Sequence, residues 1–354
     1  MKTKIYTMTH RAFRRPEDEI YIPLHVGRSN AAELGYLGDD TGENISEQNP
    51  YYGELTGLYW IWKNETEADV IGVCHYRRYF LTTDGNLMTQ KDYENELENC
   101  DILVSEINIS STMTNREVYA RCHNIADMEA VGEALRQLYP EDYPIFCKVL
   151  SENECCYGNL MVTSREKFNE YCSWLFPIFE MASRKIDVSG YDLYHKRVYG
   201  FCSELLLYVW IQARGYRFKG CKIGITSEKA ETIEFKHVIG QLIAEGNIDE
   251  ARKTYCEQLS LRPDIGLRGA DFKCEVPVIK TLLCILYEEH RRGADSLLSL
   301  SRDLSVLIMH CKNVKKLLEQ HGKHVREVGA EYFAEFPISD TALEIIEKDI
   351  QGNL

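Results

Sequence analysis

The feature that most constrains this chain is an unbroken run of apolar and small residues that ends in a histidine and two arginines. Residues 70–74 read Val-Ile-Gly-Val-Cys, and they lead into His75, Arg77 and Arg78. The run lacks the alternation of a half-exposed strand, so it predicts a strand covered on both faces in the middle of a parallel sheet. Open α/β sheets bind ligands at the carboxyl ends of their strands. We therefore predict a ligand site at the end of this strand.

Two adjacent arginines at such a position indicate an anionic ligand. A guanidinium group matches phosphate oxygens two at a time and keeps its charge at any cellular pH. Arg77 and Arg78 are therefore candidates to bind phosphate, with His75 beside them. The alternative is a pair of surface arginines after an edge strand.

Length and composition predict a globular protein of two parts. The chain has 354 residues, of which 44% are hydrophobic, which is enough for a sizeable core. We predict one domain over residues 1–233 and a second over residues 234–354, where the pattern changes to almost pure helix. The net charge of −14 argues against general nucleic-acid binding, which requires a basic surface.

Cysteine usage and hydropathy predict a cytoplasmic protein. The 13 cysteines form no Cys-x-x-Cys pair and no visible zinc spacing, which fits a reducing compartment. The first residues turn polar at once and lack the apolar core of a signal peptide. The longest apolar runs, residues 205–211 and 282–287, fall short of the ~20 residues that cross a bilayer. We expect a soluble chain, or one attached to a membrane surface.

Further candidate site residues lie in the first fifth of the chain. A short β-prone run, residues 5–8, ends at Thr9 and His10, where a nucleotide base could sit. Asp39 and Asp40 lie in a glycine-flanked loop and could hold a divalent cation, since hard ions prefer carboxylate oxygens. They could equally form a turn, which is the interpretation we favour.

Two helices and a second strand follow from the local patterns. Asn49, followed by a proline, is typical of a helix start, and this helix should run to about Lys63. Residues 116–138 predict a helix with a His-Asp pair four residues apart, which could bind a ligand or form a plain surface hydrogen bond. Residues 156–162 predict a second buried strand, entered through Gly158 and Asn159.

One segment of the helical part is locally basic in an acidic protein. Between residues 310 and 326, five cations face the lone acid Glu319, namely Lys312, Lys315, Lys316, Lys323 and Arg326. Such a segment can attract anionic lipids, with about 1 kcal/mol per charge near the surface. The alternative is an ordinary solvated helix face.

Many short motifs, in one order over residues 3–225, resemble a family of bacterial capsular and exopolysaccharide biosynthesis proteins that are glycosyltransferases. The resemblance covers the first domain and not the helical tail. It is carried chiefly by residues 6–10, 21–23, 39–46, 54–56, 59–64, 75–80, 171–176, 190–192, 197–201 and 203–204.

The resemblance implies an α/β fold of the GT-A type, with a single Rossmann-like mixed sheet, flanking helices and an all-helical C-terminal domain. Such enzymes end a central strand in Asp-x-Asp, which holds a metal ion on the donor diphosphate. Here that strand ends in His75, Tyr76, Arg77 and Arg78. The departure indicates that the arginines neutralise the leaving diphosphate. We therefore predict no firm metal site, with Asp39 and Asp40 as the fallback for Mn²⁺ or Mg²⁺.

The resemblance also assigns the site residues. We predict that the nucleotide-sugar donor is bound by Thr9, His10, Asp40, Asn44, Asn49, His75, Arg77, Arg78 and Asn159. If the reaction inverts the anomeric carbon, a carboxylate must act as general base. Glu204 is the first candidate and Asp192 the second. Glu204 in the first turn of a helix would also simply favour the helix dipole.

The leading hypothesis is a glycosyltransferase that moves a sugar from a UDP-linked donor, such as galactose or its furanose form, onto a lipid-linked oligosaccharide in capsule or exopolysaccharide synthesis. The alternative is a non-catalytic adaptor that binds nucleotide sugars and uses its helical tail to bind a partner protein. Turnover separates the two, since an adaptor releases no UDP. A sugar nucleotidyltransferase is disfavoured, because the chain lacks the glycine-rich basic loop near its amino terminus.

Overall fold

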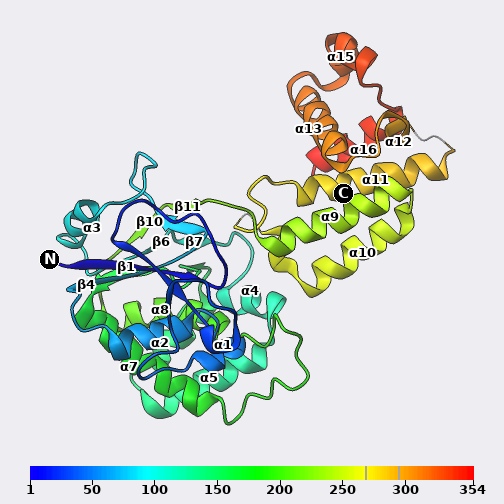
Figure 1. Cartoon of the computed structure of the whole chain (residues 1–354). Helices are drawn as coiled ribbons and strands as arrows, with labels where there is room; N and C mark the ends of the chain where they lie inside the picture. The colour runs from blue at the N-terminus through cyan, green and yellow to red at the C-terminus, as the bar shows by residue number, and fades with distance from the viewer. Residues whose placement is uncertain (268, 294–295) are drawn as a thin grey trace. The chain divides into compact units, whose positions relative to one another are not determined.

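The computed structural model describes residues 1–267, 269–293 and 296–354, and it divides into two compact units, Met1–Thr226 and Ser227–Leu354 (Figure 1). The division falls just before the helix α9 (Ala230–Glu245), so the boundary that we predicted after residue 233 lies inside that helix.

The first unit is built on a mixed sheet of nine strands. Its main path runs in the order β10-β6-β9-β4-β1-β2-β3, and β5 and β11 continue it as a side branch from β4. The strands are β1 (Thr3–Thr9), β2 (Tyr21–His25), β3 (Leu37–Gly38), β4 (Val70–His75), β5 (Arg78–Phe80), β6 (Ile102–Ser105), β9 (Met161–Ser164), β10 (Phe218–Cys221) and β11 (Ile223–Ile225). A separate pair joins β7 (Asn108–Ile109) to β8 (Glu154–Cys155).

The strand β4 is central and buried, as predicted. Its residues 70–74 are all buried, and alternate side chains reach opposite faces of the sheet. Ile71 and Val73 belong to the larger core cluster, whereas Val70 and Cys74 belong to a smaller one. The prediction of an all-parallel environment is wrong, because β4 pairs parallel with β1 but antiparallel with β9.

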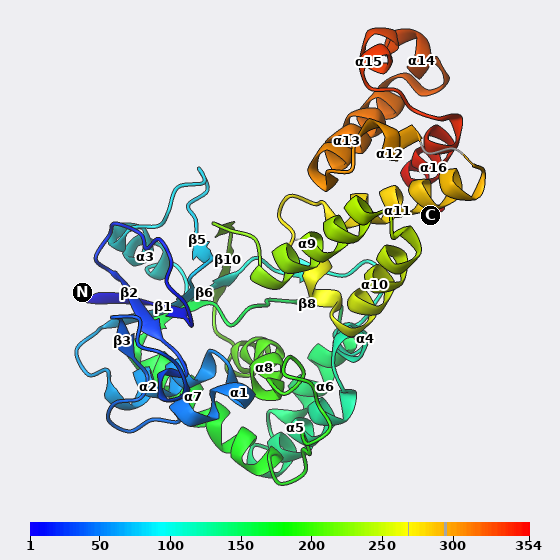
Figure 2. The same cartoon turned by 45° about the vertical axis from the view of Figure 1, so that its right-hand side comes forward.

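Helices cover both faces of this sheet. The larger core packs beneath α2, α7 and α8, and the smaller core lies on the other face, beside α3 (Figure 1, Figure 2). Leu55 and Leu58, in the segment before β4, are buried in the larger core. The helices of this unit are α1 (Asn49–Tyr52), α2 (Leu55–Asn64), α3 (Gln90–Leu97), α4 (Asn115–Cys122), α5 (Ile125–Leu138), α6 (Tyr143–Ser151), α7 (Arg165–Ala182) and α8 (Val198–Arg214).

The second unit is helical throughout its described residues, which confirms the predicted architecture of a mixed α/β sheet followed by an all-helical region. It has its own apolar core, formed mainly by α9, α10, α11, α13 and α16. Its helices are α9, α10 (Ile248–Leu261), α11 (Val276–Arg291), α12 (Ser296–Leu300), α13 (Leu304–His321), α14 (Val325–Val328), α15 (Ala330–Glu335) and α16 (Asp340–Ile350).

A buried lysine links the acids of the second unit. The ammonium group of Lys236 lies 2.7 Å from a carboxylate oxygen of each of Glu228, Asp271 and Glu275. These acids form the one cluster in the described residues with metal-like spacing, and Lys236 already occupies its centre. The arrangement is therefore an internal ion-pair network. Loss of one partner would leave buried charge unpaired.

Acids from elsewhere in the unit pair with three of the five cations of the basic segment at residues 310–326. Lys315 lies 2.7 Å from Asp349, and Lys312 lies 4.0 Å from Glu275. Arg326 pairs with Asp340. Membrane attachment through this segment stays a prediction. The net positive charge that the segment offers a membrane is smaller than the sequence indicates. Over the described residues, no helix combines the length and apolar character needed to span a bilayer.

Candidate functional site

The direction of the strands brings three chain segments to one edge of the sheet. The strands β1 and β4 run parallel and end there, at Thr9 and His75. The strand β9 runs the other way, so its amino end lies at the same edge, and Gly158 and Asn159 come just before it. Polar groups from the end of one strand and the beginning of another therefore meet, as the topology requires.

A tight hairpin sets the two arginines in different environments. His75 pairs with Arg78 across the turn formed by Tyr76 and Arg77. Arg77 is buried, with 7% of its surface exposed, whereas Arg78 is only half-buried. A Cβ atom added to Gly158 would lie 3.2 Å from Nη1 of Arg78, so this glycine allows the guanidinium to approach the backbone. Of the two arginines, Arg78 is the one that a ligand can reach.

Asn159 ties together three elements at this edge. Its Nδ2 donates to Oε1 of Glu54 at 2.6 Å and to the carbonyl of Gly200 at 3.0 Å. Its Oδ1 accepts from the hydroxyl of Ser203 at 2.9 Å. The residue is buried and has a φ of 52°, a left-handed conformation that asparagine tolerates better than most residues. Its amide is engaged by protein groups, which fits a positioning role better than direct contact with a sugar.

A break in a predicted helix delivers Glu54 to the site. We predicted one helix from Asn49 to Lys63, but α1 and α2 are separate, because Gly53 interrupts them with a φ of 55°. Glu54 stands at this break, and its carboxylate is held by Asn159. The sequence prediction missed Glu54 as a site residue. The glycine three positions after Pro50 was the available signal.

Glu204 lies close to Glu54 and to two arginines. The helix α8 begins at Val198, so Glu204 lies in its second turn and not in the first, and the helix dipole is no longer a sufficient explanation for an acid there. The pKa of its carboxyl is raised to about 7, chiefly by burial and then by the neighbouring Glu54, against the opposing effects of Arg78, a backbone hydrogen bond from Gly158 and Arg197. A carboxyl with such a pKa can exchange a proton near neutral pH.

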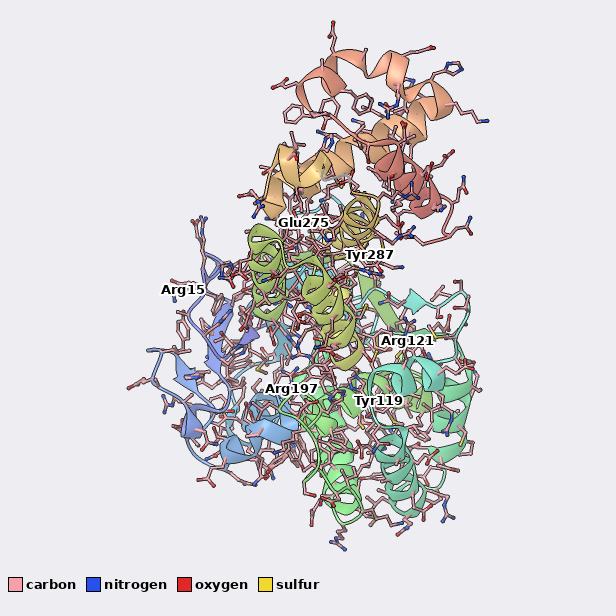
Figure 3. The ribbon with its side chains drawn as sticks, turned by 90° about the vertical axis from the view of Figure 1, so that its right-hand side faces the viewer. Arg15, Tyr119, Arg121, Arg197, Glu275 and Tyr287 are labelled. Carbon is pink, nitrogen blue, oxygen red and sulfur yellow. The ribbon has the colours of Figure 1, made fainter. Side chains whose placement is uncertain are left out.

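Arg197 and His75 complete the cluster. The guanidinium of Arg197 lies 5.3 Å from the ring centres of both Tyr194 and Phe201, at the start of α8 (Figure 3). In the described part of the chain, neither Arg197 nor Arg78 has a carboxylate within ion-pair distance. Burial lowers the pKa of His75 to about 4, so this imidazole is neutral at physiological pH. Its Nε2 is buried and has no hydrogen-bond partner among the described residues.

The predicted residues of the first loops lie in their own network. Asp39 accepts from the backbone N–H groups of Gly27 and Arg28 and from the hydroxyl of Ser46. Asp40 binds the guanidinium of Arg28 at 2.6 Å. Both oxygens of Asp39 and one oxygen of Asp40 are engaged by hydrogen-bond donors, which fits a turn better than a site for a divalent cation.

Four other predicted donor ligands are placed as follows. Asn44 bonds within its own loop, to Gly42 and Ser46. Asn49 donates to the carbonyl of Gly53 and to Thr56, and so stabilises the turn between α1 and α2. Thr9 is buried and donates to the carbonyl of Arg11. His10 is exposed and packs edge-on against Tyr76, with ring centres 5.4 Å apart.

Asp192, the second candidate base, lies in a different environment from Glu204. Its carboxylate accepts from the backbone N–H groups of Tyr194 and His195, and it lies 2.6 Å from Nδ1 of His195. It lines a pocket between the junction of α4 and α5 and the start of α8.

The predicted single helix over residues 116–138 is wrong, because the chain leaves the helix at His123 and begins a new one after Asn124.

Comparison with known proteins gives a family and a similar fold for the first unit. A family model described as a domain of unknown function (DUF4422) matches residues 4–215. Among solved structures, the chain is similar to the apo structure of the bifunctional glycosyltransferase WbbM, with a TM-score of 0.59 and 30% identity over 64% of this chain and 46% of that one. The chain thus spans less than half of the WbbM chain. A search of curated proteins gives no match. The fold is therefore glycosyltransferase-like.

Proposed function

The chain belongs to the family described as a domain of unknown function (DUF4422), and from this premise we propose that it is a glycosyltransferase that uses a nucleotide-sugar donor. We propose UDP as the nucleotide and a lipid-linked glycan of surface polysaccharide synthesis as the acceptor. The observation that carries the proposal is the placement of Glu204 beside Arg78 and Arg197 at the carboxyl edge of β4. Ligands of open α/β sheets bind at this edge.

The diphosphate of the donor would bind at Arg78. This half-buried guanidinium has no carboxylate within ion-pair distance among the described residues, so it can accept two phosphate oxygens. Arg77, one residue earlier, adds positive charge from below the surface. In this proposal the arginines neutralise the charge that develops on the leaving group, a role that a metal ion fills in enzymes with Asp-x-Asp.

The nucleobase would stack on aromatic residues near the end of β1. His10 and Phe13 both pack against Tyr76, with ring centres 5.4 and 6.1 Å apart. Tyr36 packs on the other side of Phe13, at 5.8 Å. All four rings are at least partly exposed, and aromatic faces of this kind bind bases with little sequence preference. The cluster lies next to the arginine hairpin, since Tyr76 is part of its turn.

Glu204 would act as the general base of an inverting transfer. Its carboxylate accepts the proton of the acceptor hydroxyl while the acceptor oxygen forms a bond to the anomeric carbon. The bond between that carbon and the β-phosphate oxygen breaks, and UDP leaves with the electron pair. A raised pKa is expected of such a base, and a purely adaptor function would not require a carboxyl held near pKa 7.

Calorimetric titration of the full chain with UDP tests the donor site directly. We expect saturable binding, with UMP weaker than UDP because it lacks the second phosphate. Absence of UDP binding, with or without Mn²⁺ or Mg²⁺, would refute the proposal. Release of UDP from a panel of UDP-hexoses, including UDP-galactose and its furanose form, then separates an enzyme from an adaptor.

A further inference from the structure

We propose that the pocket between α4, α5, the loop at residues 190–195 and the start of α8 binds one neutral hexopyranose ring, the acceptor-end sugar of the proposed reaction. The acceptor role of this sugar rests on the proposed function, but the binding of a sugar ring in the pocket can be tested by itself. The pocket has a volume of about 160 Å³. At about 10–15 Å³ of cavity volume per water, that is room for roughly ten water molecules, which is the scale of a single sugar ring.

One wall of the pocket is aromatic. The ring of His123 stacks on Phe201, with centres 4.0 Å apart and planes 20° apart. The ring of Tyr119, on α4 (labelled in Figure 3), has its centre 5.0 Å from that of His123. Val198 adds an aliphatic surface. The C–H face of a pyranose is apolar and needs such a surface, because it offers no hydrogen bonds of its own.

The lining also supplies hydrogen-bond acceptors. Asp127 is buried, with 4% of its surface exposed, and the hydroxyl of Tyr191 donates to its two oxygens at 3.1 and 3.0 Å. Asn124 in turn donates to the same tyrosine oxygen. No lysine or arginine lines the pocket. Burial raises the pKa of the Asp127 carboxyl, and among the described residues no cation lies within ion-pair distance of it, so a ligand that brings hydroxyl donors suits this group.

The chemistry of the lining selects the ligand class. Sugar hydroxyls donate to carboxylates, whereas a phosphate or a uronic acid would be repelled by Asp127 and Asp192. A metal ion is disfavoured, since among the described residues only Glu228, Asp271 and Glu275, in the other unit, gather with metal-like spacing. A neutral sugar ring fits both parts of the lining.

The pocket adjoins the candidate catalytic cluster through one residue. Arg197 lies over Phe201, which lines the pocket, and it is close enough to Glu204 to lower the pKa of that carboxyl. Arg78, in the β4–β5 hairpin, also lowers the pKa of Glu204. Glu204 is thus near both Arg78, the proposed diphosphate ligand, and Arg197, which lies over a residue of the pocket lining. A general base must contact the acceptor hydroxyl, so the pocket suits the acceptor and not the donor.

Saturation-transfer NMR tests this inference with the full chain and methyl glycosides of galactose, glucose, mannose and N-acetylglucosamine. We expect transfer to at least one of these probes, reduced five-fold or more in Asp127→Asn. The matched control is Asp187→Asn, an exposed acid of the same loop region that does not line the pocket and should bind as the wild type does. Should Asp127→Asn fail to fold, Tyr191→Phe replaces it, since it removes only the hydroxyl that holds Asp127.

Two results would overturn the inference: no transfer to any probe with the wild-type chain, or equal transfer with both pocket variants. UDP titration of the same samples separates this inference from the proposed function. Sugar binding that depends on Asp127 without any UDP binding would leave the pocket as a sugar site and reject the donor proposal. UDP binding without saturation transfer to any methyl glycoside would reject the pocket as a sugar site and leave the donor proposal standing.

Discussion

The side-chain amide of Asn159 donates a 2.6 Å hydrogen bond to the carboxylate of Glu54, although the two residues are 105 positions apart in the chain. The same amide binds Gly200 and Ser203 on α8. One buried residue thereby fixes the helix break that carries Glu54 and the helix that carries Glu204. The distance between the two carboxylates, which helps to set the pKa of Glu204, depends on it.

Two substitutions separate the backbone role of Asn159 from its side-chain role. Asn159→Gly keeps the left-handed conformation easy and removes only the amide, so we expect a loss of about 1–3 kcal/mol in the free energy of unfolding. Asn159→Ala loses the amide and also strains the backbone at φ 52°, which adds about 1 kcal/mol. Denaturant unfolding followed by tryptophan fluorescence measures both, because all four tryptophans lie in the first unit. Equal stability of the two variants would contradict the backbone argument.

Loss of the Arg78 guanidinium should weaken donor binding. Arg78→Ala removes a charge-assisted contact worth about 1.5–3 kcal/mol, so we expect UDP affinity to fall roughly 10-fold to 150-fold. Arg184→Ala, which removes an exposed arginine on the same unit, is the control and should bind UDP normally. Calorimetry at fixed ionic strength gives the comparison. An unchanged dissociation constant in folded Arg78→Ala would move the phosphate site elsewhere.

Glu204→Gln should stop the chemical step and leave the donor site intact. A general base contributes about 10²–10⁴-fold, so kcat should fall by that factor while UDP affinity stays within two-fold. In the wild-type enzyme, kcat/KM should rise with pH until about pH 7, where the Glu204 carboxyl loses its proton, and then level off. Measurement of UDP release from pH 5 to 9 gives the profile. A variant with wild-type turnover would exclude Glu204 as the base.

The same substitution should stabilise the folded chain at alkaline pH. The pKa of Glu204 is raised from 4.5 to about 7 on folding, so the folded state holds its proton more tightly than the unfolded state. Its contribution to stability is therefore complete below pH 4.5 and is lost as the pH rises through about 7. Relative to wild type, Glu204→Gln should gain about 1–3 kcal/mol between pH 4.5 and pH 8. Parallel denaturant curves at both pH values give this difference, and a gain that is independent of pH would contradict the assigned pKa.

Lys236 should be essential for the helical unit and irrelevant to the sheet. Lys236→Met leaves three buried or partly buried carboxylates without their cation, which should destabilise that unit by about 3–5 kcal/mol. The loss should appear in the far-ultraviolet circular dichroism transition and not in tryptophan fluorescence, since the second unit has no tryptophan. Lys253→Met, which removes an exposed lysine paired only with Glu250, is the matched control.

The sequence predicted features that depend on local patterns. The buried run of β4 and the helical second unit were readable from apolar spacing, and the polar residues after β4 did lie at a sheet edge. What it did not reveal depends on contacts between distant residues. Donor binding by Asn159 stays a prediction, whereas its hydrogen bonds to Glu54 and to α8 were not predicted.

Charge was another property that local reading misjudged. The cations of residues 310–326 seemed unopposed in sequence, but Asp340 and Asp349 reach them from later in the chain. For Asp39 the sequence left a turn and a divalent-cation site open, with the turn favoured, and could not show that the backbone N–H groups of Gly27 and Arg28 bind its oxygens. Partners at this separation cannot be inferred from spacing in one sequence.

The lysine at the centre of the three acids of the helical unit has a consequence for the conditions under which that unit stays folded. A cation attached to the chain cannot be diluted away or removed by a chelator, and it needs no supply from the cell. The three acids therefore keep their shared cation whatever metal ions the surroundings supply.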